Sequence, residues 1–299
     1  MNVISPLTTL DHTRKVKDIS TDWLKERYQK RYNVDISRFT KGLDSISQYE
    51  CLDSGFLFFV PGGISGDDQF YQQLSSSKDY YIDWKWEHEA ALPYLDKSHK
   101  ILEIGCGKGG FLRKLTRDGF DISGTELNSK QYDLLAKEGL TIYPDLLSRH
   151  KTRNITYDDI VSFQVLEHID NPRSFILDSL AMLRPGGKFI FCVPNNDSFI
   201  KDDPNLILNM PPHHMGLWTE DSIKAITKLF PLTLETILFE PLQPHHHMHY
   251  LKTRSLKWFG DKFFRKLILA AILPIGLLYL RLFSSRIRGQ SILAVYTKK

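Results

Sequence analysis

The chain has 299 residues, of which 42% are hydrophobic and 25% are charged. This composition is typical of a folded protein with one large core, and it excludes a disordered or fibrous chain. The net charge is only +4, but residues 251–299 hold eleven Lys or Arg against one acid, Asp261, so the basic excess belongs to the C-terminal part.

Residues 1–99 show no regular alternation of strands and helices. A helical pattern covers Thr21–Tyr32, an irregular aromatic-rich stretch runs from Tyr49 to Tyr81, and a second helical pattern covers residues 83–95. We interpret residues 1–99 as a cap on the main domain.

From Lys100 onward, short apolar runs alternate with helical patterns. Strands are predicted at 100–105, 121–127, 141–147, 158–167, 188–195, 232–240 and 291–299, and helices at 108–119, 129–140 and 172–187. This alternation indicates a Rossmann-like α/β fold, with a mostly parallel sheet covered by helices on both faces. We assign residues 100–250 to this core, 251–289 to an insert, and 290–299 to the last strand of the core.

The cysteines and the N-terminus bear on the compartment. Cys51, Cys106 and Cys192 are far apart and form no C-x-x-C pair, so the sequence indicates neither a disulfide framework nor a zinc finger. The first residues lack the apolar core of a signal peptide. A reducing, cytoplasmic setting is therefore expected.

A glycine turn follows the first strand of the core. Gly105, Gly107 and Gly110 match G-x-G-x-x-G, in which glycines let the backbone approach a ligand and the next helix offers free N–H groups to an anion. Glu126 ends the second strand, 21 positions after Gly105, where a carboxylate can hold both ribose hydroxyls. These features suit NAD and S-adenosylmethionine equally.

Glu103 favours one of these two cofactors. It stands two residues before the first glycine, at the tip of the strand. Its carboxylate would repel the two charges of a pyrophosphate, whereas S-adenosylmethionine carries an ammonium, a sulfonium and a single carboxylate. The sequence therefore predicts S-adenosylmethionine as the cofactor.

Four ordered motifs carry a family resemblance. The segments EIGCGKGG, TEL, FQVLEH and LRPGGK resemble the motifs of class I S-adenosylmethionine-dependent methyltransferases, over residues 100–240 and the last strand. The resemblance implies a seven-stranded sheet with an antiparallel last strand. It also implies a set of cofactor-binding residues: Glu103, Gly105, Gly107 and Gly109 at the turn, Glu126 and Leu127 at the ribose, Asp145 and Leu146 near the adenine, and Gln164 and Val165 beneath the methionyl part.

Three histidines are candidate catalytic residues. Methyl transfer depends mostly on holding the nucleophile in line, and a hydroxyl nucleophile also gains from a base near neutral pH. His168 lies in LEHID, and His213 and His214 lie in PPHHMGLWTED. Because adjacent residues of an extended segment cannot both face the substrate, we expect one of the pair, His214 first, to be the base. The alternative is that His168 and Glu167 cap a helix while His214 packs the lid.

The same motifs resemble those of ubiquinone-pathway O-methyltransferases and small-RNA 2′-O-methyltransferases. In those families E-x-x-E-H and a later histidine can bind a divalent metal. Gln164 replaces the first acid here, which weakens a site for a hard cation, although Glu167, His168 and His214 would still supply three ligands. We therefore assign no metal ligands.

Two further groups of residues are interpreted as non-catalytic. His245, His246, His247 and His249 are expected on a solvated rim, because adjacent histidines of a strand point to opposite faces and cannot share a metal. The aromatic residues of the cap are expected to be packing residues, the alternative being that they close over the substrate or cofactor. They are Tyr80, Tyr81, Trp84 and Trp86.

A basic, apolar segment, Lys262–Arg288, precedes the last strand. Leu267–Leu280 is uncharged and mostly apolar, but it is shorter than the roughly twenty residues that span a bilayer, and Pro274 and Gly276 would break or kink a helix there. Flanking cations predict an interfacial segment on an anionic membrane, beside the ligand-binding edge of the sheet. The alternative is a dimer interface or a buried helix pair. Nucleic acid is not expected, since an aliphatic run offers little stacking surface.

Together these features predict a cytoplasmic methyltransferase, peripherally attached to a membrane and acting on an oxygen of a lipid-linked glycan or a quinone-like phenol. The layout of cap, core motifs, PPHH-x-x-x-W and late insert also resembles methyltransferases of surface-polysaccharide synthesis. One alternative is a nicotinamide-dependent oxidoreductase or epimerase, which would lack Glu103 and usually carry a Y-x-x-x-K pair that this chain does not have. The other is a scaffold that binds the cofactor without using it.

Overall fold

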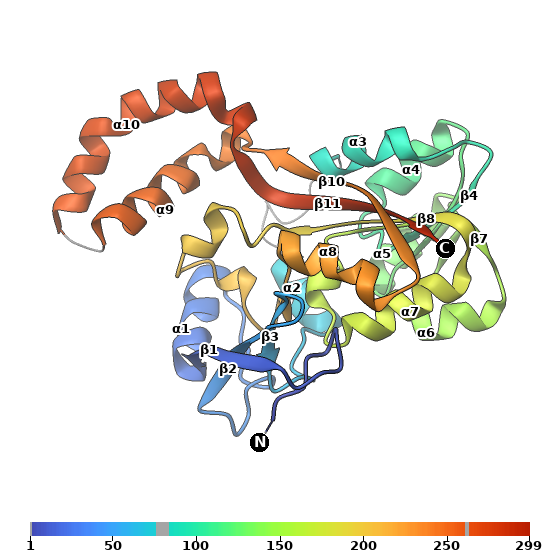
Figure 1. Ribbon diagram of the computed structural model, residues 1–299, viewed down its shortest axis with the longest axis horizontal. Helices are drawn as coiled ribbons and strands as arrows, with labels where there is room; N and C mark the ends of the chain where they lie inside the picture. Colours follow the sequence, from blue (N-terminus) through green and yellow to red (C-terminus); the bar gives the residue numbers. More distant parts are fainter. Residues whose placement is uncertain (1, 76–83, 261–262) are drawn as a thin grey trace.

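The computed structural model describes residues 2–75, 84–260 and 263–299. Its centre is a seven-stranded sheet in the order β10-β11-β8-β7-β4-β5-β6 (Figure 1). Strand β11 runs antiparallel to both β8 and β10, and the other neighbouring strands are parallel. The strands are β4 (Lys100–Ile104), β5 (Asp121–Thr125), β6 (Ile142–Tyr143), β7 (Tyr157–Phe163), β8 (Leu183–Pro194), β10 (Leu232–Pro241) and β11 (Arg288–Lys298). The predicted Rossmann-like fold with an antiparallel last strand is confirmed.

Helices cover both faces of this sheet because its strands are apolar on both sides. Along β8, Phe189 and Phe191 belong to one buried cluster, while Ile190 and Cys192 belong to the other. The accompanying helices are α3 (Trp86–Ala91), α4 (Gly110–Arg117), α5 (Ser129–Lys137), α6 (Leu147–His150), α7 (Pro172–Met182) and α8 (Glu220–Leu229). Side chains cap three of them: Asn128 on α5, Asn171 on α7 and Thr219 on α8.

Several predicted boundaries were wrong. The helix predicted at 172–187 ends at Met182, and its Pro-Gly-Gly lies inside strand β8. A Cβ at Gly187 would lie 2.4 Å from the carbonyl oxygen of Asp158, so this glycine permits close approach to β7 and does not stop a helix. The strands predicted at 141–147 and 158–167 end earlier, at Tyr143 and Phe163.

The cap contains a second sheet that the sequence analysis did not predict. Strands β1 (Thr13–Ser20), β2 (Ser45–Cys51), β3 (Leu57–Val60) and β9 (Gly216–Leu217) pair antiparallel in that order. The stretch from Tyr49 is therefore partly a hairpin, and β9 joins the cap to the core by hydrogen bonds. Helix α1 (Thr21–Tyr32) has the predicted bounds, and α2 spans Asp68–Ser75.

Two turns of the cap share one hydrogen-bond pattern. In Ser5–Thr9 the last N–H donates to the first carbonyl at 2.9 Å, and in Cys51–Gly55 the same bond is 2.8 Å long. The last residue of each turn has positive φ, 63° and 68°. The Thr8 hydroxyl lies 3.4 Å from the Cys51 thiol. Burial acts to raise the pKa of this thiol, but the hydroxyls of Ser54, Thr8 and Ser5 lower it. These buried contacts join the N-terminal turn to the β2–β3 hairpin.

Helices α9 (His247–Phe259) and α10 (Phe263–Phe283) stand between β10 and β11 and project together from the body of the molecule (Figure 1). We call this pair the hairpin. Helix α10 continues through Pro274 and bends along its length, so it is not broken. A Cβ at Gly276 would lie 3.1 Å from Leu251 of α9, which shows how closely the two helices pack. Across the described ranges, no helix is long and apolar enough to cross a membrane.

Candidate functional site

The glycine turn joins β4 to α4 at the carboxyl edge of the sheet. Gly105, Gly107 and Gly109 have φ values of 70°, 55° and 73°, a region that glycine adopts without strain. A Cβ at Gly105 would lie 2.7 Å from a methyl group of Val165, and one at Gly109 would lie 2.5 Å from Leu135. Both positions therefore require glycine for packing as well as for conformation.

Two buried acids lie beside this turn. Glu103 is 4% exposed, and its Oε2 atom has no hydrogen-bond partner among the described residues. Glu126 accepts hydrogen bonds from the N–H groups of Gly107 and Asn128, each 2.7 Å long. Burial and then the charge of Glu126 raise the pKa of Glu103 to about 8, and burial also raises the pKa of Glu126. Such a pair repels a pyrophosphate, whereas a phosphate-free cation relieves the cost of burying it.

Exposed apolar side chains follow the next two strands. Leu127, after β5, is 56% exposed, and Leu146, after β6, is 61% exposed. Exposed leucines at neighbouring strand ends suit the face of a planar base. Asp145 is buried and accepts a 2.5 Å hydrogen bond from Arg153, and this bond lowers its pKa. Its carboxylate is thus already paired, and its contact with adenine stays a prediction.

Gln164 follows β7 in a left-handed conformation, with φ of 56°. Its amide nitrogen lies 3.5 Å from Glu87 Oε1, Cys192 Sγ and Ser291 Oγ. The sequence analysis missed Glu87 and Ser291, because they come from the cap and from the last strand and meet only in the fold.

The residues at the carboxyl edge fit S-adenosylmethionine. They are the glycine turn, Glu126, and Glu103 with its unpaired Oε2 atom.

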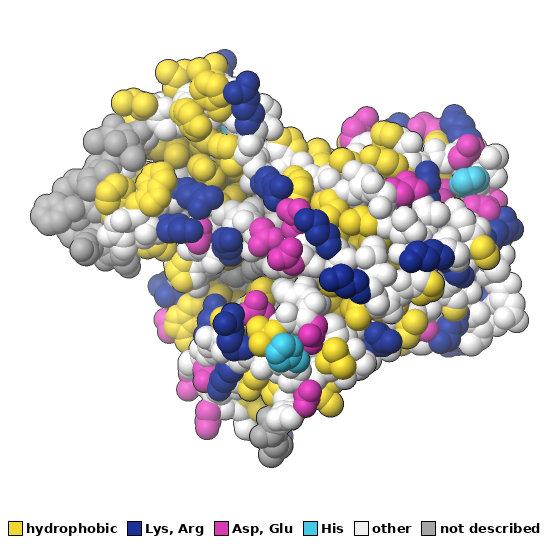
Figure 2. All heavy atoms as spheres, in the orientation of Figure 1, with side chains coloured by type: hydrophobic (Ala, Val, Ile, Leu, Met, Phe, Trp, Pro, Cys, Tyr) yellow, Lys and Arg dark blue, Asp and Glu magenta, His cyan; other side chains and the backbone are white. Residues whose placement is uncertain are grey.

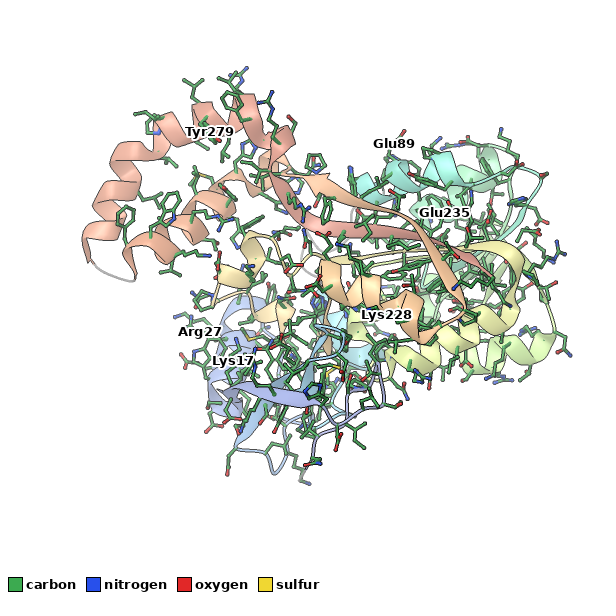
Figure 3. The ribbon with its side chains drawn as sticks, in the orientation of Figure 1. Lys17, Arg27, Glu89, Lys228, Glu235 and Tyr279 are labelled. Carbon is green, nitrogen blue, oxygen red and sulfur yellow. The ribbon has the colours of Figure 1, made fainter. Side chains whose placement is uncertain are left out.

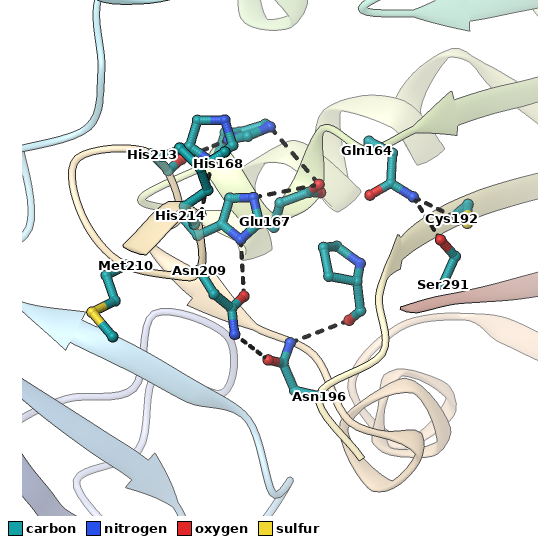
Figure 4. A network of polar contacts seen from close by, with 12 residues as sticks. Gln164, Glu167, His168, Cys192, Asn196, Asn209, Met210, His213, His214 and Ser291 are labelled. Atoms are coloured by element: carbon teal, nitrogen blue, oxygen red, sulfur yellow. Dashed lines mark hydrogen bonds and ion pairs between the residues drawn. The ribbon is translucent and has the colours of Figure 1, made fainter. Parts of the chain in front are cut away.

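The three candidate histidines meet in one cluster (Figure 4). The rings of His213 and His214 lie 4.6 and 4.9 Å from the ring of His168, and they stack on each other at 4.5 Å. The premise that His213 and His214 lie in an extended segment is wrong, and which of the two faces the substrate stays a prediction. The segment is a turn, in which the N–H groups of His213 and His214 both donate to the Met210 carbonyl at 3.1 Å.

The ring nitrogens of this cluster are oriented by their partners. His168 Nδ1 lies 2.6 Å from the His213 carbonyl oxygen, and His214 Nδ1 lies 3.1 Å from Asn209 Oδ1. Because both partners accept, Nδ1 carries the proton and Nε2 keeps a lone pair. The two Nε2 atoms lie 3.8 and 4.0 Å from Glu167 Oε1.

Burial sets the protonation of this group. It raises the pKa of Glu167 to about 8, lowers that of His168 to about 4, and lowers that of His214 well below its ordinary value. At neutral pH the imidazoles are therefore neutral, and Glu167 holds a proton. A hydroxyl group placed between these atoms would find Nε2 lone pairs ready to accept its proton.

Two asparagines extend the network beyond His214. Asn209 donates to Asn196 Oδ1 at 2.8 Å, and Asn196 donates to the Pro194 carbonyl at 3.2 Å (Figure 4). This series of hydrogen bonds from Pro194 to His214 fixes the imidazole relative to the end of β8. Sequence reasoning did not find these residues, because an isolated asparagine in a loop carries no pattern.

The residues interpreted as non-catalytic have mixed outcomes. Trp84 and Trp86 pack against a buried cluster, as expected, while Tyr80 and Tyr81 lie outside the described residues. The second histidine group begins α9 and is neither strand nor open loop. Only His245 is exposed, and His249 bonds to Asp203 at 2.7 Å, so a solvated rim describes this group only in part.

The hairpin exposes one apolar face. Ile275, Leu278, Tyr279 and Leu282 are 73%, 59%, 54% and 65% exposed, and their spacing places them on one side of α10. Leu280, on the opposite side, is fully buried against a cluster that contains Phe199. Figure 2 shows apolar and basic side chains gathered on the hairpin, and Figure 3 shows Tyr279 pointing away from the body. The basic side chains of Lys262, Arg265 and Lys266 are outside the described residues.

We expect the purified protein to bind S-adenosylmethionine and not NAD, and the substitution Glu126→Ala to weaken that binding. Loss of charged hydrogen bonds to the ribose costs about 1.5–3 kcal/mol, which is roughly a 10- to 150-fold rise in the dissociation constant. Calorimetry measures the dissociation constants of the two proteins. The control is Glu138→Ala, which removes an exposed ion pair with Arg113. Tight binding of NAD without binding of the methyl donor would refute the assignment.

Glu103 makes the stabilisation of the protein by its cofactor depend on pH. Its folded-state pKa is raised from 4.5 to about 8, so its contribution to stability is complete below pH 4.5 and is lost as the pH rises through about 8. An ionised Glu103 attracts the cationic cofactor. We expect S-adenosylmethionine to raise Tm more above pH 8 than at acidic pH, and Glu103→Gln to reduce this difference. Scanning fluorimetry measures these shifts. If S-adenosylmethionine raised the Tm of the wild-type protein equally at both pH values, this expectation would be contradicted.

The chain is similar to known methyltransferases. The model of a family described as a methyltransferase domain matches residues 80–263. A ubiquinone biosynthesis O-methyltransferase from Nitrosococcus oceani is 31% identical over 103 residues, which are 32% of this chain and 44% of that protein. One from Vibrio parahaemolyticus is 26% identical over 105 residues, 33% of this chain and 45% of that protein. The chain thus spans less than half of these relatives. A solved S-adenosylmethionine-dependent methyltransferase from Mesorhizobium loti has a TM-score of 0.49 and 16% identity, covering 72% of this chain and 99% of that chain.

Proposed function

The chain belongs to the methyltransferase domain family and uses S-adenosylmethionine, and from this premise we propose that it methylates a hydroxyl oxygen of a lipid-linked glycan or a quinone-like phenol. The reaction takes place at the cytoplasmic surface of a membrane. When bound, the cofactor supplies an electrophilic methyl group on a sulfonium. Glu103, Glu126 and the glycine turn hold it at the carboxyl edge of the sheet.

The observation that carries oxygen as the acceptor atom is the convergence of His168 Nε2 and His214 Nε2 on Glu167 Oε1. A neutral imidazole with a fixed tautomer accepts the proton of the hydroxyl at its Nε2 atom. Asn209 orients His214 through its Nδ1 proton. The surrounding burial excludes water, which strengthens the hydrogen bonds that hold the imidazolium that forms.

The hairpin supports a membrane-bound acceptor. It leaves the sheet between the end of β10 and the start of β11, and both lie at the edge that carries the glycine turn. Its exposed apolar face is flanked by cations such as Arg281 and Arg286, a pattern typical of segments that lie in an anionic headgroup region. A lipid-borne hydroxyl would therefore arrive beside the cofactor.

The test is methyl transfer from labelled S-adenosylmethionine to a membrane lipid extract, followed by mass spectrometry of the labelled product. We expect label in the organic phase, on an oxygen of a glycolipid or phenol. Label on a water-soluble amine would overturn the proposal. Cofactor binding without label in any fraction would favour a non-catalytic scaffold.

The histidine cluster also predicts the response to chelators. His168, His213 and His214 place nitrogen atoms within 4.8 Å of one another, a spacing that metal ligands also have. Glu167 pairs with His168 and His214, and Gln164 supplies an amide where a hard cation would need a carboxylate. We expect initial rates to be unchanged after dialysis against a chelator. A loss restored by adding back one divalent metal would assign these residues as its ligands.

A further inference from the structure

A cleft outside the cofactor site separates the cap sheet from the segment 196–221. Its volume is about 450 Å³, and neither the glycine turn nor Glu103 and Glu126 line it. One wall is the cap sheet, and the other is formed by the loop after β8 and the start of α8. The cleft is therefore built by the cap, the part of the chain that a methyltransferase core does not need for cofactor binding.

The floor of this cleft is a row of residues across three strands. Lys17 of β1 pairs with Gln48 of β2, which pairs with Phe59 of β3, so the three side chains share one face of the sheet. All three line the cleft, and Figure 3 marks Lys17 in the cap. An ammonium, an amide and an aromatic ring thus lie side by side.

Gln48 has no partner for its amide. The residue is 5% exposed, and its side chain makes no hydrogen bond with any part of the chain that the structure describes. The amide borders the cleft, so its donor and acceptor atoms are available to a ligand there. A ligand that both donates and accepts hydrogen bonds would pair with them.

The walls define the class of ligand. Amides, carboxylates, lysines and a hydroxyl alternate with apolar side chains, so donors and acceptors are mixed. Acids outnumber lysines, which disfavours a ligand rich in phosphate. The charged lining residues are Lys17, Glu50, Asp197, Lys201, Asp203 and Asp221. Neutral hydroxyls, each a donor and an acceptor, match this lining best.

The cleft lies between the hairpin and His214, the proposed base. Asn196 and Asn209 line it, and Asn209 accepts the Nδ1 proton of His214 (Figure 4). At the other end, a smaller hollow of about 290 Å³ shares Lys17 and Lys201 with the cleft and reaches Leu256 and Lys257 of α9. If the lipid part of an acceptor lay on the hairpin, its polar part would lie in these two hollows and reach toward His214.

We propose that the cleft binds the saccharide part of a lipid-linked acceptor, with Gln48 as a specificity-determining residue. This inference rests on the glycan form of the proposed function, because a phenolic acceptor has no use for the row of Lys17, Gln48 and Phe59. The sugar lies over the row of Lys17, Gln48 and Phe59 and exchanges hydrogen bonds with Gln48 and the opposite wall. The hydroxyl to be methylated reaches past Asn209 toward His214.

Saturation-transfer NMR on the full chain tests the site, with methyl glycosides of glucose, galactose, mannose, rhamnose and N-acetylglucosamine as probes. We expect at least one glycoside to bind wild-type protein and not Leu57→Trp, which fills the cleft. Gln48→Leu should weaken the affinity about 2- to 10-fold, because one neutral hydrogen bond is lost. Gln29→Leu, which removes an amide bonded to Asn33 on α1, is the matched control and should bind normally.

Two outcomes overturn the inference. One is that no glycoside binds wild-type protein, and the other is that Leu57→Trp binds as wild type does. A Tm that falls in Gln48→Leu would show that the amide is structural, since removal of an unpaired group leaves stability unchanged or raised. Methyl transfer to a lipid-borne phenol without glycoside binding would refute only this site. Glycoside binding without methyl transfer would refute only the proposed reaction.

Discussion

Replacement of His214 by alanine lowers kcat by about 10²- to 10⁴-fold, while the dissociation constant of S-adenosylmethionine stays close to that of wild type. In the proposed reaction the imidazole acts on the proton of the acceptor, an interaction that strengthens only in the transition state. Its Nε2 atom faces Glu167, and its Nδ1 atom is held by Asn209. Turnover at saturating substrate and calorimetry of cofactor binding measure the two quantities.

The control for this experiment is another histidine beside a buried carboxylate. His99 lies 2.8 Å from Asp159 just before β4, at the opposite edge of the sheet, so His99→Ala should lower stability and leave kcat unchanged. His213→Ala is not a neutral control, because the two rings are stacked. If His214→Ala keeps wild-type turnover while His168→Ala loses it, the base is His168.

Replacing the apolar face of the hairpin with serine abolishes vesicle binding and keeps cofactor binding. The variant carries four substitutions, at Ile275, Leu278, Tyr279 and Leu282. Each side chain that enters the headgroup region contributes about 1–2 kcal/mol, and each cation near an anionic surface contributes about 1 kcal/mol. Wild-type binding should therefore weaken as salt rises but not vanish. Sedimentation with anionic vesicles at two salt concentrations measures it.

A matched variant separates membrane binding from general loss of apolar surface. Ile4, Leu10 and Leu52 are also exposed, and they lie on the cap. Their substitution by serine should leave vesicle binding intact. Light scattering completes the test: if wild type never sediments with vesicles and is a dimer that the four serines dissociate, the face is a subunit interface.

The periodic parts of this protein were predictable from sequence. Apolar runs such as Phe189–Val193 indicate buried strands, because both faces of the central sheet are covered. The glycine turn and Glu126 were predictable because they belong to a local sequence motif. Helix α1 has a clear cap, in which the Ser20 hydroxyl accepts a hydrogen bond from Trp23, and its bounds were predicted without error.

The cap sheet was missed because its signals are weak. Strand β1 is an edge strand in which only Ile19 is buried, so it shows no apolar alternation. Strand β9 has two residues and pairs with a partner more than 150 positions earlier. The position of Gln48 depends on the pairing of β2 with β1 and β3, and that of Asn209 on a loop whose sequence shows no periodic pattern. Their roles depend on neighbours that no local pattern specifies.

The paired turns of the cap bear on metal engineering. Ser5, Thr8, Cys51 and Ser54 have the spacing of two C-x-x-C pairs, with hydroxyl groups where a structural zinc site carries three of its four thiols. Hydroxyls are poor zinc ligands, and here the contact of Thr8 with Cys51 joins the two turns. Replacement of Ser5, Thr8 and Ser54 by cysteine would offer four thiols in the spacing of two zinc-binding pairs. Stability of the cap would then depend on zinc supply and on pH, as in metal-dependent small domains.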